Sequence, residues 1–253
     1  MTHRSGLRAW LAAIGLLLSV PAFAHYPILI GDRPPSLGEH GGQISLTFGR
    51  GHLHAPKWEE VQAPDWVRGY TFDGMTMELT DKLRKAGPVY RLDYTSQRVG
   101  DTWVVFHIPQ AWTDHDRGWS ETTVRTLIHH GLARGWETPL GLPLEIVPLN
   151  QPYGILAGDS ARLQLLANGK PLADTNIYAE KYFRPPLQEP YPPDEIITRT
   201  VRTDATGVAA VTLHSPGWWV LFATHETGEQ QKDGKSGPTI VQDAVWVYVS
   251  PLP

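Results

Sequence analysis

The sequence contains no cysteine among its 253 residues. This absence excludes disulfide bonds, thiolate metal ligands, cysteine nucleophiles and a lipid-modified N-terminal cysteine. Basic residues are also few, since 22 lysines and arginines stand against 26 acidic residues and the formal charge is −4. The chain therefore has no basic field that would bind nucleic acid. A hydrophobic content of 41% with only 19% charged residues argues against intrinsic disorder.

Long apolar runs are absent beyond the first residues of the chain. Residues 1–24 have the three parts of a secretory signal: Arg4 and Arg8, an apolar run over residues 9–20, and the small-x-small sequence Ala22-Phe23-Ala24. This run is too short to cross a bilayer of about 30 Å as a helix. We therefore expect a cleaved signal peptide at 1–24, a periplasmic protein that does not span the membrane, and a mature chain that begins at His25. An uncleaved anchor is the alternative.

Turn-forming residues are abundant, with 24 glycines and 22 prolines, and ten tryptophans add aromatic area. Frequent glycine and proline disfavour long helices, and short apolar runs between turns favour strands. The composition therefore predicts an all-β protein. In the first half we expect strands at Gln43–Phe48, Thr76–Leu79, Val89–Tyr94, Thr102–Ile108 and Thr122–His129, with short helical turns at Lys57–Val61 and Thr80–Lys85.

The arrangement of the expected strands predicts two β-sandwich domains, with a boundary between Pro148 and Pro152. The first comprises residues 25–147 and the second residues 148–253. The second has the strand count of an immunoglobulin-like or carboxypeptidase-regulatory-like sandwich, and Asn168-Gly169 is a strong hairpin signal. Two inserts are expected to be loops: the proline-rich segment Arg184–Glu195 and the polar segment Gly228–Pro238.

Histidine is the residue type that carries candidate chemistry. Eight of the 11 histidines lie within residues 25–147. A terminal His25 could bind a metal ion through its α-amine and its imidazole, because both lose protons near neutral pH. In His52-Leu53-His54 the two rings share a face if the backbone is extended. His25, His52 and one of the adjacent pair His129 and His130 could thus surround one ion, and imidazole suits nickel, cobalt, copper and zinc.

Several longer phrases of this chain resemble a bacterial family of exported proteins described as periplasmic components of nickel or cobalt uptake systems. The resemblance rests on Ala24-His25, on Phe48-Gly49 followed by His52, and on the strand that ends at His129. It also rests on the phrases LEIVPL at 144–149 and NGKPLA at 168–173. The chain departs from the family pattern at 53–55, where Leu-His-Ala replaces a proline and an acidic residue, and after the late-strand histidine at 130–132.

The resemblance implies a metal-binding first domain and a β-sandwich second domain. His25 and His52 match family histidines, and His129 matches a third; His54 or His130 could substitute. We therefore expect a binding protein, not an enzyme, that takes a divalent transition metal, nickel or cobalt in preference to copper or zinc, and delivers it to a membrane transporter.

Two other functions remain open at this stage. One is a copper redox protein with an N-terminal histidine brace, which needs a second brace histidine. The other is a carbohydrate- or protein-binding sandwich without metal, which predicts an exposed row among four tryptophans: Trp58, Trp66, Trp112 and Trp119.

Overall fold

The computed structural model describes residues 25–253 except 56 and 115, and the expected signal peptide at 1–24 lies outside these described residues. The described chain is almost entirely β-structure, with one short 3-10 helix, Thr80–Lys82, and one helical turn, α1 (Asp194–Ile197). The prediction of an all-β sandwich fold is confirmed. None of the helices among these residues is long and apolar enough to span a membrane.

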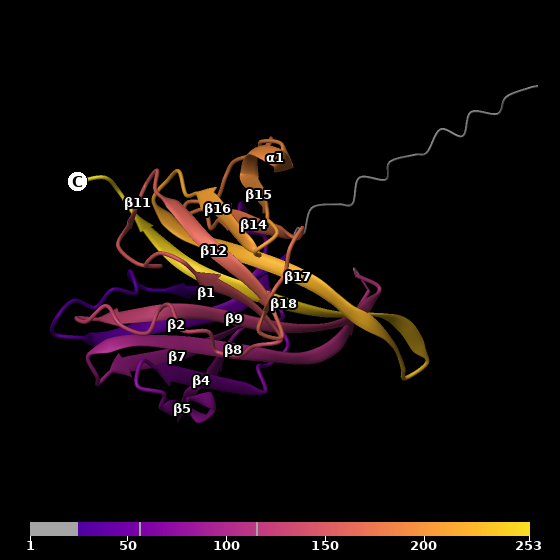
Figure 1. Ribbon diagram of the computed structural model, residues 1–253, viewed down its shortest axis with the longest axis horizontal. Helices are drawn as coiled ribbons and strands as arrows, with labels where there is room; N and C mark the ends of the chain where they lie inside the picture. Colours follow the sequence, from indigo (N-terminus) through magenta and orange to yellow (C-terminus); the bar gives the residue numbers. More distant parts are fainter. Residues whose placement is uncertain (1–24, 56, 115) are drawn as a thin grey trace, which may run out of the picture.

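A nine-stranded sheet forms the middle of the molecule (Figure 1). Eight of its strands follow one another in the order β15-β14-β17-β18-β9-β8-β4-β5, and β11 pairs with the end of β18. The strands are β4 (Trp66–Thr71), β5 (Thr76–Glu78), β8 (Gly100–Thr113), β9 (Gly118–His130), β11 (Ile155–Leu156), β14 (Asn176–Lys181), β15 (Thr198–Arg202), β17 (Gly217–Lys232) and β18 (Lys235–Ser250).

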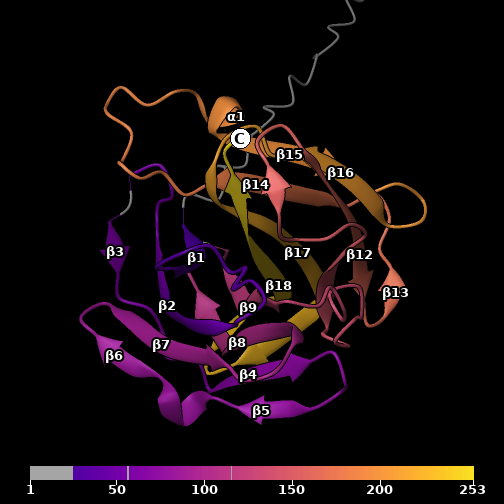
Figure 2. The same cartoon turned by 90° about the vertical axis from the view of Figure 1, so that its left-hand side faces the viewer.

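Two smaller sheets cover the two faces of this central sheet. The five-stranded sheet contains β1 (Tyr26–Gly31), β2 (Gly42–Gly51), β3 (Trp58–Glu59), β6 (Arg84–Ala86) and β7 (Val89–Ser96). The four-stranded sheet contains β10 (Leu144–Pro148), β12 (Ser160–Ala167), β13 (Lys170–Pro171) and β16 (Val208–Thr212). In Figure 2, β1, β2 and β3 lie to the left of β17 and β18, and β12 and β13 lie to their right.

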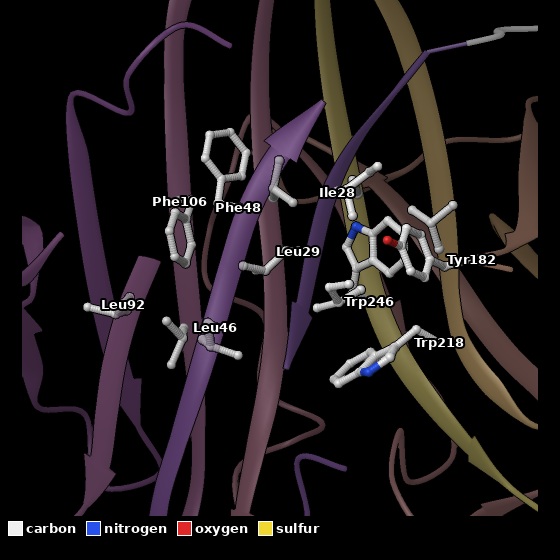
Figure 3. Packing of buried hydrophobic residues seen from close by; sticks show 14 of the residues in the cluster. Ile28, Leu29, Leu46, Phe48, Leu92, Phe106, Tyr182, Trp218 and Trp246 are labelled. Atoms are coloured by element: carbon white, nitrogen blue, oxygen red, sulfur yellow. The ribbon is translucent and has the colours of Figure 1, made fainter. Parts of the chain in front are cut away.

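The central strands are apolar on both faces because both faces are covered. On β17, Trp218, Val220 and Phe222 belong to the core shared with the five-stranded sheet. The alternate residues Trp219 and Leu221 belong to the core shared with the four-stranded sheet. Figure 3 shows the first of these cores, with one group of side chains at the left (Leu46, Phe48, Leu92 and Phe106) and another at the right (Ile28, Tyr182, Trp218 and Trp246).

The two halves of the chain share the central sheet. β9 from the first half pairs in parallel with β18 from the second. A fully buried ion pair supports this junction: the Arg125 Nη2 atom on β9 donates to Asp243 Oδ2 on β18 at 2.8 Å and to the Ile146 carbonyl at 2.8 Å. The division into domains at 147/148 stays a prediction, and the central sheet contains strands from both sides of it.

Three local expectations can be compared with the structure. The Asn168-Gly169 turn is confirmed, since both residues have positive φ and join β12 to β13. The helical turn expected at Lys57–Val61 is wrong, because residues 58 and 59 pair with β2 as the strand β3. The polar loop expected at Gly228–Pro238 is also wrong, since β17 and β18 continue through it as a hairpin that projects from the molecule in Figure 1.

Candidate metal centre

The pairing of β1 with β2 brings two of the predicted histidines together. Tyr26 pairs with Gly51 in this antiparallel ladder, so the next pair in the same register is His25 opposite His52. Their ring centroids are 4.2 Å apart. Because directly opposed residues share one face of a sheet, both rings project from the same side of these strand ends. The three strands β1, β2 and β3 lie side by side at this edge in Figure 2.

A carboxylate from β3 completes the group. Glu59 lies opposite Arg50 in the pairing of β3 with β2, two positions from His52 along β2 and on the same face. Its Oε1 atom is 3.0 Å from Nε2 of His25. One potential ligand atom each of His25, His52 and Glu59 lies within 4.8 Å of the others, and all three residues are half-buried. We call these three residues the His–Glu cluster.

The spacing of the His–Glu cluster suits one metal ion. Imidazole nitrogens and carboxylate oxygens bind transition metals at about 2.1 Å, so two ligands of one ion lie at most about 4.2 Å apart. Small side-chain rotations would bring the three donor atoms to that separation. The Nδ1 atom of His52 is buried and has no hydrogen-bond partner among the described residues. Leaving such a group unsatisfied costs about 1–3 kcal/mol, so this nitrogen favours a bound ligand.

The electrostatics of the site favour neutral imidazoles. Burial lowers the pKa of His25, and His52 and Arg50 nearby lower it further, while Glu59 raises it. Burial and the neighbouring His52 also lower the pKa of His54. A neutral imidazole keeps the lone pair that a metal ion needs, so fewer protons compete with the ion at neutral pH.

His54 lies beside the His–Glu cluster but has other partners. Its ring centroid is 5.6 Å from that of His52 and 4.8 Å from that of Tyr191. Its Nδ1 atom is 3.8 Å from Oε1 of the buried Glu180. The proline-rich segment 184–195 covers this side of the site, because the Leu187 amide donates to the His54 carbonyl at 2.8 Å. His54 is therefore positioned to support the segment rather than to complete the ligand set.

His129 lies elsewhere in the fold. Its Nδ1 atom is 2.7 Å from Oδ1 of the buried Asp101, and its ring stacks on Tyr153 at 4.1 Å. Burial raises the pKa of the Asp101 carboxyl, and His129 opposes that rise. His129 bridges to Ser36, beyond the far end of β1, and the six residues of that strand span roughly 20 Å. Strand pairing thus places His129 away from His25, contrary to the grouping expected from the sequence.

His130 is also outside the His–Glu cluster. Its Nδ1 atom is 3.0 Å from the Ser96 hydroxyl oxygen, and its Nε2 atom is 3.3 Å from the Glu39 carbonyl oxygen. Both ring nitrogens are therefore occupied by groups of the protein, and the ring is buried. Of the five predicted site residues, the structure brings His25 and His52 together, places His54 beside them, and places His129 and His130 elsewhere.

Sequence reasoning missed Glu59. A short helical turn was expected over Lys57–Val61, and all five ligands expected from the sequence were histidines. No local signal identifies Glu59, because Glu59 and Glu60 are adjacent polar residues and the apolar residues on either side, Trp58 and Val61, are three positions apart, which is not the alternation of a strand.

The four tryptophans expected to form an exposed row, all among the described residues, do not form one. Trp119 is buried, and Trp58, Trp66 and Trp112 are half-buried. Trp66 stacks on His107 at 4.8 Å, and Trp112 packs edge-on against Trp119 at 5.5 Å.

Comparison with known proteins gives one informative match. Among curated proteins no relative matches. Among solved structures, a Salmonella alpha-2-macroglobulin mutant (Y1175G) is 14% identical, with a TM-score of 0.27, and the alignment covers 89% of this chain and 15% of that one. An Escherichia coli alpha-2-macroglobulin activated by porcine elastase is 11% identical, with a TM-score of 0.25 and coverage of 89% and 20%. TM-scores this low carry no argument. Residues 22–227 match the family described as "Domain of unknown function (DUF4198)", and the chain belongs to this family.

Proposed function

We propose that this protein binds a divalent transition metal ion, nickel or cobalt in preference to copper or zinc, in the periplasm and passes it to a membrane transporter. The His–Glu cluster carries the proposal, because two imidazoles and a carboxylate converge with a buried nitrogen that lacks a partner. Such nitrogen and oxygen donors suit nickel and cobalt. The family resemblance supports the same metals. No bond is broken in this function, so no catalytic residue is assigned.

The way in which the ion would bind follows from the contacts. The Nε2 atom of His25 and Oε1 of Glu59 are 3.0 Å apart, within hydrogen-bond distance. An ion that binds between imidazole and carboxylate would replace the proton of this hydrogen bond, so binding would release a proton. Once the predicted signal peptide is removed, the α-amine of His25 could become a further donor; because it chelates an ion together with Nδ1 and not with Nε2 of its own ring, the imidazole would have to turn so that Nδ1 faces Glu59 and His52. His52 and Glu59 come from strand ends that the β1–β2–β3 pairing holds in place, so the site is largely preorganised.

Calorimetry on the processed chain that begins at His25 tests this function. We expect one nickel or cobalt ion per chain, and weaker binding when one extra residue precedes His25 and blocks the α-amine. Equal affinity of the two proteins would remove the amine from the ligand set. Absence of any binding to either protein would refute the metal-binding function.

One observation favours a second candidate, a copper redox protein. A histidine brace needs a second histidine beside the terminal one, and His52 meets that condition with its ring 4.2 Å from that of His25. The test is consumption of oxygen or peroxide by the copper-loaded protein in the presence of a reductant. If the copper-loaded protein consumes neither oxygen nor peroxide under these conditions, the copper redox function is excluded and the metal-transport function is retained.

A further inference from the structure

A pocket adjoins the His–Glu cluster and shares His25 with it. Its volume is about 140 Å³, and it lies between the five-stranded sheet and the central strands β8, β9, β17 and β18. An apolar cavity of about 150 Å³ holds one benzene molecule. The pocket can therefore receive one six-membered ring next to the proposed metal ion.

The apolar groups of the pocket come from two sheets. Phe48 lies on β2 of the five-stranded sheet, and Ile108 and Phe222 lie on the central strands β8 and β17. Phe48 and Phe222 are buried within the core. A flat ring between the two sheets would therefore contact apolar side chains from both. The central sheet becomes polar next to Ile108, where its cross-strand partner Thr122 donates from its hydroxyl to the Gln242 side-chain oxygen at 2.7 Å.

The charged side chains that line the pocket are the guanidinium of Arg50 and the carboxylates of Glu60 and Asp116. Glu60 is bound by the Lys85 ammonium at 3.1 Å, and the Asp116 carboxylate accepts a hydrogen bond from the Thr113 hydroxyl at 2.9 Å. Arg50 also lines the pocket and forms no ion pair with a carboxylate in the described part of the chain. Arg50 is thus the cation of the wall without a carboxylate partner, whereas the Asp116 carboxylate is satisfied by hydroxyl donors. A ligand carboxylate is the best geometric match for the guanidinium.

The position of Arg50 places such a carboxylate beside the ion. Arg50 precedes His52 by two residues on the extended end of β2, so the two side chains share a face. Three side-chain donors and one amine also leave positions free on an ion that accepts six nitrogen and oxygen ligands. A ligand that enters from the pocket could fill these positions.

We infer that the pocket binds a small carboxylate chelator with one planar ring, so that the protein takes up its metal as a complex with that chelator. The inference rests on the proposed metal-binding function. The ring would pack against Phe48 and Phe222, the carboxylate would accept hydrogen bonds from Arg50, and the chelating atoms would face the ion held by the His–Glu cluster.

Pyridine-2-carboxylate is a suitable probe, because its ring matches the pocket and it chelates nickel through a nitrogen and a carboxylate oxygen. Calorimetry and equilibrium dialysis with nickel should give a ternary complex of one chain, one ion and one probe. Benzoate lacks the chelating nitrogen and pyridine lacks the carboxylate. We expect each to bind the nickel-loaded protein at least tenfold more weakly than pyridine-2-carboxylate.

Two variants separate the pocket from the metal site. Ala111→Phe fills the pocket from β8 at a residue that is not part of the His–Glu cluster. Arg50→Gln removes the guanidinium. Both should bind nickel alone with affinity within a few-fold of the native protein and bind the probe at least tenfold more weakly. If Ala111→Phe does not fold, Thr122→Leu fills the same pocket from β9.

The outcomes distinguish the two proposals. If the native protein binds no nickel with or without the probe, the metal-binding function itself fails. If it binds nickel but pyridine-2-carboxylate only strips the ion into solution, the inference about the pocket is overturned and the metal site stands. A ternary complex that the Arg50 and pocket-filling variants leave unchanged overturns the inference in the same way.

Discussion

The ring of His25 lies opposite the ring of His52 because β1 and β2 pair in an antiparallel register that ends at Tyr26 and Gly51. The contact therefore depends on strand pairing and not on local sequence. Glu59 joins the two rings only because β3 pairs with the other edge of β2. Three segments of chain that are not adjacent in sequence thus form one site at a sheet edge.

Removing His52 should abolish most of the metal affinity. Removing a group that only orients a metal ligand already lowers metal affinity by about 10–100-fold. His52 is itself a proposed ligand, so His52→Ala should weaken nickel binding by roughly 100-fold or more. His54→Ala is the matched control, because His54 lies next to the site and contacts Tyr191 and Glu180. Its affinity should stay within a few-fold of the native value, as measured by calorimetry. Equal losses in both variants would contradict the ligand set proposed here.

Glu59→Gln should weaken nickel binding by roughly 10-fold or more, because the amide keeps the shape of the side chain but removes the anionic oxygen beside His25. Glu60→Gln is the control, since Glu60 pairs with Lys85 and lies outside the cluster. Competition against a colorimetric chelator gives both affinities. A control variant that loses as much affinity as Glu59→Gln would show a general charge effect instead of coordination.

His129→Ala should affect the fold and not the metal. Asp101 is buried, and His129 is one of the groups that hold its carboxylate. Without the imidazole the carboxylate loses a charge-assisted partner, and we expect a loss of about 1–3 kcal/mol in the free energy of unfolding. Nickel affinity should stay within about twofold. Urea denaturation and calorimetry on the same preparation check the two expectations, and a large loss of affinity in a stable variant would return His129 to the ligand set.

The stability of the protein should fall as pH rises from about 4.5 to about 7 because of Glu180. Burial raises the pKa of this carboxyl from 4.5 to about 7, and Thr198 donates to it at 2.7 Å. Within this window the unfolded chain releases the proton while the folded chain keeps it, so higher pH favours unfolding. A shift of this size corresponds to about 3 kcal/mol at neutral pH.

Glu180→Gln isolates this contribution, because the amide does not titrate and can still accept a hydrogen bond from Thr198. Urea denaturation at pH 4.5 and pH 7.5 should show the native protein losing about 3 kcal/mol relative to the variant over that interval. Parallel pH profiles for the two proteins would mean that Glu180 does not titrate between these limits.

The all-β character could be predicted from the sequence because it depends on local rules. Asn168 and Gly169 adopt the positive φ values that their turn requires. In β12, which precedes them, buried and more exposed residues largely alternate, as in a strand with one buried face. Segment 228–238 was expected to be a loop because it is polar. It forms a hairpin instead, since β17 and β18 continue their backbone pairing beyond the covered part of the sheet, where polar side chains meet solvent.

By itself, the sequence determined which residues could serve as ligands: it provides no thiolate and offers many imidazoles, among them His25 and His52. The tertiary structure decided which of them meet. Strand register places His25 against His52, and the pairing of β3 with β2 places Glu59 beside them. His129 instead contacts Asp101, at the other end of β1. The physical reason is that side-chain alternation is a local property of a strand, whereas pairing partners and register come from the burial of whole sheets against each other.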